Sequence, residues 1–61
     1  MPVIEVKTVG KLEEEQKAEI AERITRTIEE VAKKPGKFIY VIFHEKERED
    51  WAWEGKLFSE R

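Results

Sequence analysis

The segment Lys37–His44, Lys-Phe-Ile-Tyr-Val-Ile-Phe-His, constrains the fold of this 61-residue chain more than any other. In an extended strand successive side chains point to opposite faces, and here apolar side chains stand on both faces. Strands with two apolar faces are typical of the buried parallel sheets of α/β proteins. We therefore expect residues 37–44 to form a strand that is covered on both sides.

The chain before this segment predicts one strand and one helix. Residues 3–9 combine β-branched and polar side chains in alternation, which predicts a strand that ends at Gly10. Residues 12–34 predict an amphipathic helix, which Pro35-Gly36 ends. The apolar side chains on one face of this helix are Ile20, Ile24, Ile28 and Val31. The order strand–helix–strand, with so long a crossover, favours a right-handed parallel β-α-β unit.

The chain after this unit is short and rich in tryptophan. A polar connection over residues 45–50 leads to Trp51 and Trp53, which alternate with Ala52 as in a strand. Gly55 permits a tight bend. We expect a short C-terminal hairpin at about residues 50–58. It is too small to be stable alone and would dock on a neighbouring subunit. The whole of residues 1–61 then forms one small α/β domain.

This arrangement leaves one face of the sheet without a cover. A single helix covers one side of a two-stranded sheet, and nothing else in the chain can cover the other side of residues 37–44. A domain of about 60 residues is marginally stable on its own. The chain has no cysteine and one histidine, which excludes disulfides and a Cys/His zinc site. Oligomerisation is the remaining way to complete the sheet.

The composition of the chain limits the classes of partner that it can bind. The chain carries 12 Lys and Arg against 14 Asp and Glu, a net charge of −2 with both signs interspersed, which does not favour nucleic-acid binding. No apolar run is long enough to span a membrane. The acidic residue Glu5 lies where a signal peptide would have an apolar or basic segment. We therefore expect a cytoplasmic protein. We see no carboxylate cluster suited to a metal and predict no cofactor.

Pro2 is the residue with the clearest chemical potential. A small residue after the initiator Met usually allows that Met to be removed, which would leave Pro2 with a free secondary amine. An α-amino group titrates at about 7.7–8.0, and burial in an apolar pocket lowers that pKa further. Such an amine is a general base near neutral pH. If Met1 is retained, the Pro2 nitrogen is a tertiary amide and takes no proton.

The chain resembles the 4-oxalocrotonate tautomerase family over nearly its whole length. The resemblance is carried by the order and spacing of short segments: Met1-Pro2-Val3-Ile4, Glu15-Gln16-Lys17, Pro35, Val41-Ile42-Phe43-His44-Glu45 and Trp51-Ala52-Trp53-Glu54-Gly55-Lys56-Leu57. It implies a tautomerase-like fold and a homohexamer built as a trimer of dimers. It also implies an enzyme whose N-terminal proline moves a proton between carbons of an enol or dienol acid.

The resemblance also implies roles for individual residues. Pro2 matches the catalytic base, and Trp51 stands where the family has a pocket aromatic, usually Phe. Tyr40 replaces the arginine of the second strand. The family's arginine in the loop before the helix aligns with Lys11 if this chain has one inserted residue. It aligns with Leu12 if there is no insertion. A tyrosine hydroxyl donates one hydrogen bond, whereas an arginine can donate two parallel hydrogen bonds to one carboxylate. Tyr40 therefore disfavours the family's usual diacid substrate.

We therefore predict a cofactor-independent tautomerase with Pro2 as the catalytic base and Lys11, Tyr40 and Trp51 as substrate-binding residues. Its substrate would be a small anionic enol, dienol or keto acid. Two alternatives stay open: a proline-dependent dehalogenase or decarboxylase of the same superfamily, and a non-catalytic oligomeric module if Met1 is retained. For His44 we expect a structural hydrogen bond rather than proton transfer.

Overall fold

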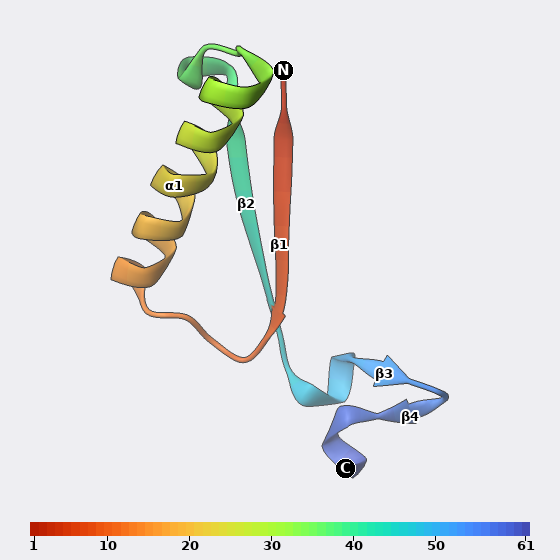
Figure 1. Cartoon of the computed structure of the whole chain (residues 1–61). Helices are drawn as coiled ribbons and strands as arrows, with labels where there is room; N and C mark the ends of the chain where they lie inside the picture. Colours follow the sequence, from red (N-terminus) through yellow and green to blue (C-terminus); the bar gives the residue numbers. More distant parts are fainter.

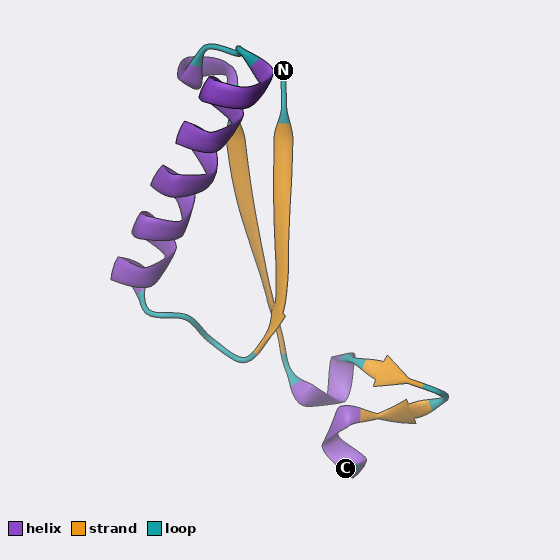
Figure 2. Ribbon diagram, viewed as in Figure 1, coloured by secondary structure: helices purple, strands orange, loops and turns teal.

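A computed structural model describes residues 1–61 as an extended β-α-β unit with a small C-terminal lobe after it (Figures 1 and 2). The elements in chain order are β1 (Val3–Val9), α1 (Glu14–Ala32), the 3₁₀ turn η1 (Gly36–Phe38), β2 (Tyr40–Lys46), η2 (Arg48–Asp50), β3 (Ala52–Trp53), β4 (Lys56–Leu57) and η3 (Phe58–Glu60). The strands β1 and β2 are parallel, with Val3 opposite Tyr40 and Val9 opposite Lys46. The predicted β-α-β unit and C-terminal hairpin are confirmed.

The second strand runs from Tyr40 to Lys46, and the expected range 37–44 is wrong at both ends. It starts later because Gly36–Phe38 form a 3₁₀ turn, in which the Ile39 N–H donates to the Gly36 carbonyl oxygen at 3.0 Å. Phe38 therefore does not continue the alternation of the strand. It ends later because the parallel register pairs the last residues of β1 with residues 45 and 46.

The helix occupies Glu14–Ala32, which is shorter than the expected 12–34. Glu13 has an extended backbone and caps the start of α1. The Glu13 N–H donates a hydrogen bond to the side-chain oxygen of Gln16 at 2.8 Å. Lys33 adopts the left-handed conformation at φ 58° and ends the helix. Pro35 prevents the residue before it from continuing a helix. No helix of the chain is long and apolar enough to cross a membrane.

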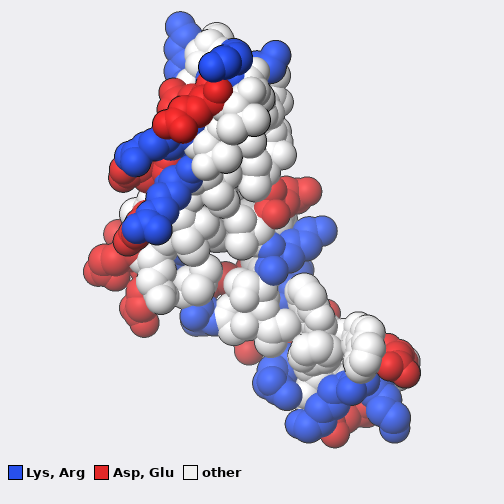
Figure 3. Space-filling view, in the orientation of Figure 1, with Lys and Arg blue, Asp and Glu red and all other residues white.

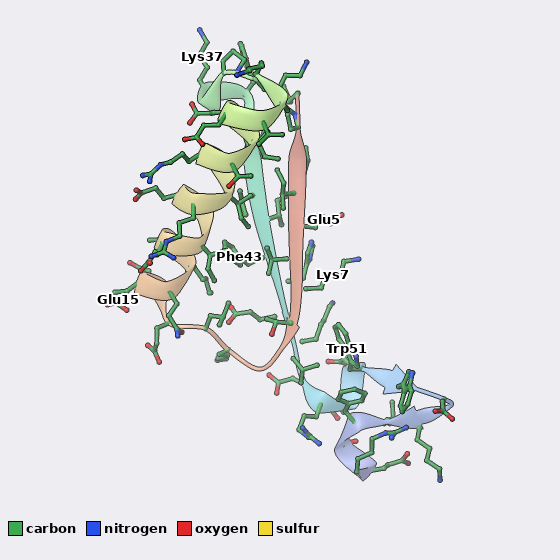
Figure 4. All side chains as sticks on the ribbon, in the orientation of Figure 1. Glu5, Lys7, Glu15, Lys37, Phe43 and Trp51 are labelled. Carbon is green, nitrogen blue, oxygen red and sulfur yellow. The ribbon has the colours of Figure 1, made fainter.

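The small core lies between α1 and one face of the sheet. Ile39, at 9% exposure, is the most buried residue, Val41 is half-buried, and the half-buried Phe43 points toward the helix (Figure 4). Val31 belongs to the same apolar stripe but is 78% exposed. Val31 lies in the last turn of α1, which ends at Ala32.

The opposite face of the sheet is open. It presents apolar side chains that remain exposed: Val3 at 54%, Tyr40 at 49% and Ile42 at 43%. Figure 3 shows charged side chains along the helix, at the edge beside β1 and on the C-terminal lobe, with a largely uncharged surface between the helix and that edge. The expectation that β2 would be apolar on both faces but covered on only one within a single chain is therefore confirmed.

The chain is far from compact. Its radius of gyration is 14.6 Å, whereas a compact domain of this length has about 10–11 Å. Its accessible surface is 5091 Å², against about 4,200 Å² for a compact protein of this mass. The C-terminal lobe accounts for the difference in shape, since it extends away from the sheet and the helix (Figure 1).

The C-terminal lobe is held together by a tight turn and two arginines. Glu54 and Gly55 both have positive φ, 51° and 80°, as a two-residue hairpin turn requires. The Arg61 guanidinium donates to the Trp53 carbonyl oxygen at 2.6 Å and lies 5.1 Å from the Trp53 ring centroid. Arg48 donates to the Phe58 carbonyl oxygen at 2.7 Å, which ties η2 to η3.

A part-buried ion pair ties the helix to the second strand. The Glu45 Oε1 lies 2.6 Å from the Lys17 Nζ, and its Oε2 accepts a hydrogen bond from the Leu12 N–H at 2.7 Å. These two bonds, with the Lys17 hydrogen bond as the larger cause, hold the pKa of the Glu45 carboxyl below its ordinary value of 4.5. The two segments that carry much of the family resemblance, residues 15–17 and 41–45, are therefore in direct contact.

The lowered pKa predicts how Glu45→Gln changes stability with pH. Because the folded state binds this proton less tightly than the unfolded state, the carboxylate stabilises the fold above about pH 4.5. That contribution is lost as the pH falls through the lowered pKa. We expect the variant to be less stable than wild type at pH 7, with a difference that shrinks below pH 4.5.

Urea unfolding at one fixed protein concentration, monitored by circular dichroism between pH 3 and 7, measures this difference. Glu47→Gln is the matched control, because that carboxylate is exposed and makes no side-chain bond. A Glu45→Gln difference that is independent of pH would contradict the assignment.

Candidate active site

Pro2 lies at the start of the sheet, immediately before β1. Its carbonyl oxygen accepts a hydrogen bond from the Tyr40 N–H at 3.0 Å, which adds one rung to the parallel ladder. The pyrrolidine ring is half-buried, and Met1 before it is 80% exposed. A proline is tolerated here because the first residue of a strand need not donate to the ladder. The contact between Pro2 and Tyr40 is through the backbone, and the Tyr40 side chain stands with that of Val3 on the open face of the sheet.

Several apolar groups gather around this end of the sheet. The amino end of β1, the last turn of α1 and η1 all lie at the same end of the molecule (Figure 1). Each presents an exposed apolar side chain: Val3, Val31 and Phe38, the last at 45% exposure. These three side chains are exposed apolar groups at the end of the molecule where Pro2 lies.

Lys11 lies at the other end of the sheet. Gly10, at φ 91°, turns the chain out of β1, and its N–H donates to the Lys46 carbonyl oxygen at 2.9 Å. The loop then runs to α1 with Lys11 exposed and Leu12 half-buried. The Leu12 side chain has no polar atom to offer an anion. Lys11 is therefore the one of these two aligned candidates that can contact a carboxylate.

Trp51 also lies beyond the carboxyl end of β2. It comes directly after η2, is half-buried, and packs edge-on against Phe58, with ring centroids 6.2 Å apart (Figure 4). Trp53 is more open, at 59% exposure. The indole of Trp51 is thus held in place by its own lobe and presents an apolar wall.

The four predicted site residues lie at two opposite ends of the strands within one chain. Pro2 and Tyr40 lie at the amino end of the strands, whereas Lys11 and Trp51 lie beyond their carboxyl end. The seven-residue strands between them span about 20 Å from first to last Cα. A small substrate that contacts Pro2 of a chain cannot reach Lys11 or Trp51 of that same chain.

Sequence reasoning missed Glu45 as the group that holds the Lys11 loop. A signal was present, since Glu45 is the only acidic residue in the segment 37–46 and comes after the apolar run.

His44 makes the structural hydrogen bond that we expected, with its Nε2 2.8 Å from the Glu5 Oε1 on the open face. No group of three or more His, Cys, Asp or Glu side chains is placed to hold a metal ion.

The one surface depression of the chain lies elsewhere. Gln16, Glu19, Ile20 and Arg23 line it, all from the first half of α1. It contains none of the predicted site residues, and Glu19 and Arg23 form an ion pair with each other on its rim. A single chain therefore has no enclosed site around any of the four candidates.

Comparisons with known proteins agree with the fold. The family model described as "Tautomerase enzyme" matches residues 2–61. A protein of Ralstonia nicotianae named "Probable tautomerase RSp1151" is 37% identical over 60 residues, which cover 98% of this chain and 92% of that protein.

Solved structures of similar proteins extend the match to three dimensions. The crystal structure of TTHB242, a 4-oxalocrotonate tautomerase homologue, has a TM-score of 0.88 and 31% identity, covering 100% of this chain and 97% of that one. The structure of YwhB, another homologue of that enzyme, has a TM-score of 0.90 and 27% identity, covering 98% of each chain. The family match over residues 2–61 and these likenesses show that the chain belongs to the tautomerase family.

Proposed function

We propose that this chain is a cofactor-independent keto–enol tautomerase in which Pro2, freed by the removal of Met1, is the general base. The observation that carries the proposal is the position of Pro2 in a tautomerase-family chain. The family match begins at Pro2, and this residue opens β1 beside a group of exposed apolar side chains. No other residue of the chain could supply a secondary amine.

An apolar cover over Pro2 would set the basicity of its amine. A free α-amino group titrates at about 7.7–8.0, and removal from water favours the neutral form. The neutral amine can then accept a proton at pH 7 and return it, since a base works best when its pKa lies near the working pH. The indole of Trp51 from another copy, together with Val31 and Phe38, is the cover that we propose.

The proposed reaction moves one proton and needs no other reagent. The Pro2 amine takes a proton from the enol hydroxyl or an activated carbon of a small anionic enol, dienol or keto acid. The electron pair that is left delocalises between the oxygen and the conjugated carbons. The prolinium then delivers the proton to a different carbon, which yields the isomer and regenerates the neutral amine.

Two further residues would hold the substrate. The Tyr40 hydroxyl would donate a hydrogen bond to the substrate oxygen on which charge develops, which favours the transition state. The Lys11 ammonium would contact the carboxylate as a point charge, without the bidentate geometry of an arginine. Tyr40, which donates one hydrogen bond, stands where the family has its strand arginine. Tyr40 and Lys11 together would therefore suit a monocarboxylate better than a diacid.

We propose that each site is built from more than one copy of the chain. Pro2 and Lys11 lie at opposite ends of strands about 20 Å long, so these two groups can meet only across an interface. The open sheet face and the extended C-terminal lobe are the surfaces available for it. By the family resemblance, the assembly would be a homohexamer, a trimer of dimers.

Replacement of the base tests the reaction. We expect Pro2→Ala to lower kcat/KM for the ketonisation of phenylenolpyruvate by about 100-fold or more, the usual contribution of a positioned general base. Ultraviolet absorbance of the enol measures the reaction rate. Equal rates for the variant and wild type would exclude Pro2 as the essential base.

The state of the amino terminus is the control for this experiment. Intact mass spectrometry of the protein from its natural host should show the loss of one Met residue. Protein that keeps Met1 in full would contradict the proline mechanism and favour a non-catalytic oligomeric module. The Pro2→Ala protein is compared only after its mass shows the same loss of Met1.

Mixed assemblies test whether the site is shared. Pro2→Ala and Trp51→Ala chains should each be weakly active alone, yet co-expressed chains should regain activity. Random mixing pairs an intact Pro2 with an intact Trp51 at about one quarter of the sites if two copies form each site. Pro2→Ala mixed with the double variant Pro2→Ala/Trp51→Ala is the control, since it has no intact Pro2. Mixtures no more active than their components would contradict a shared site.

Ile42 tests the assembly surface. We expect Ile42→Lys to reduce the assembly below six chains, because it places a charge in the open apolar face that the assembly would bury. Light scattering after size-exclusion chromatography measures the mass. Glu30→Lys, on the exposed side of α1, is the control and should keep the wild-type mass. A wild-type mass of one chain would contradict the proposal.

A further inference from the structure

Glu45 is the only acidic side chain that joins three separate parts of the chain. Its carboxylate stands on β2, bonds the Lys17 ammonium of α1 at 2.6 Å and accepts the Leu12 N–H of the connecting loop at 2.7 Å. The other ion pairs lie within the helix or on the open sheet face, and none touches a loop. Glu45 and Lys17 are mostly shielded, with 24% and 32% of their side chains exposed.

Apart from its bond to Glu45, this loop is hydrogen-bonded only at its two ends. Gly10, whose backbone is permissive, and the next three residues connect β1 to α1. One backbone bond fixes the start of this loop, from the Gly10 N–H to the Lys46 carbonyl oxygen at 2.9 Å. The bond from Leu12 to Glu45 fixes its middle, directly after Lys11. Without that bond the Lys11 backbone would be tied down only at its ends.

Glu45 also acts on Lys11 through charge. The pKa of the Glu45 carboxyl is lowered mainly by the Lys17 hydrogen bond, and the Lys11 ammonium adds a small attraction of the same sign. They form no direct ion pair, because Glu45 is already bonded to Lys17 and Leu12. The Lys11 ammonium therefore stays exposed and available to an external anion.

We infer that Glu45 is a positioning residue for substrate recognition: its bond to the Leu12 N–H holds the loop so that Lys11 is presented to the substrate carboxylate. This inference rests on the proposed function, in which Lys11 binds that carboxylate. Glu45 itself touches no substrate. Its loss should therefore weaken substrate binding and leave the proton transfer at Pro2 nearly unchanged.

The first measurement needs no substrate. Amide hydrogen exchange by NMR should be about tenfold faster at Leu12 in Glu45→Gln, and faster still in Glu45→Ala, because a neutral amide is a weaker acceptor than a carboxylate. Lys17→Met breaks the ion pair but keeps the Leu12 bond, so Leu12 exchange should stay near the wild-type rate. Glu47→Gln, an exposed carboxylate in the same connection, is the control for the charge change.

The second measurement is a double-variant cycle in KM. With phenylenolpyruvate we expect Glu45→Gln and Lys11→Met each to raise KM by about threefold to tenfold, with kcat changed by less than about twofold. The double variant Glu45→Gln/Lys11→Met should match Lys11→Met alone, because Glu45 acts through Lys11. A merely structural role for Glu45 would make the two effects on KM independent.

The outcomes separate this inference from the proposed function. Leu12 exchange that is unchanged in both Glu45 variants overturns the inference. Faster exchange with an unchanged KM, or with independent effects of Glu45 and Lys11, also overturns it while leaving the Pro2 mechanism intact. A wild-type protein with no activity, or one as active as Pro2→Ala, refutes the proposed function, and the role in recognition falls with it.

Discussion

The parallel pairing of β1 with β2 is the constraint on which the rest of the structure depends. A parallel pair needs a long crossover, and the 19-residue helix that provides it covers only one face of the sheet. The other face stays open with Tyr40 and Ile42 half-exposed. The same pairing directs both strands one way, so the residues at their amino ends and those beyond their carboxyl ends are separated by the full length of the sheet. An incomplete core and a divided site therefore have one geometric cause.

The candidate site residues are divided between the two ends of the sheet. One copy of the chain supplies neither an enclosed pocket nor the full set of candidate groups, because its own Pro2 and Lys11 are separated by the length of a strand. Under the proposed function, association would complete the core and the site in the same step. Folding, assembly and catalysis would then depend on the same apolar surface, with Pro2 at its edge.

Several features of the fold and site were predictable from the residues, and others were not. Alternation in residues 3–9 and the helical spacing of Ile20, Ile24 and Ile28 predicted the β-α-β unit, because local periodicity reports which faces are apolar. The start of β2 was wrong because a local 3₁₀ turn forms at Gly36–Phe38, and its end was wrong because the register with β1 depends on backbone bonds to distant residues. Glu45 was missed for the same reason, since its partners Lys17 and Leu12 are 28 and 33 residues away.

The sequence by itself determined the elements, the apolar surplus on β2 and the candidate chemistry of Pro2, all of which are properties of residue type and spacing. Only the tertiary structure decided which candidates are neighbours. It joined the backbones of Tyr40 and Pro2, put Lys11 and Trp51 at the far end of the strands, and joined Glu45 to the Lys11 loop. The physical reason is that the exact hydrogen-bond register and the side-chain contacts join segments far apart in the chain, whereas residue type and spacing report only local structure and which faces are apolar.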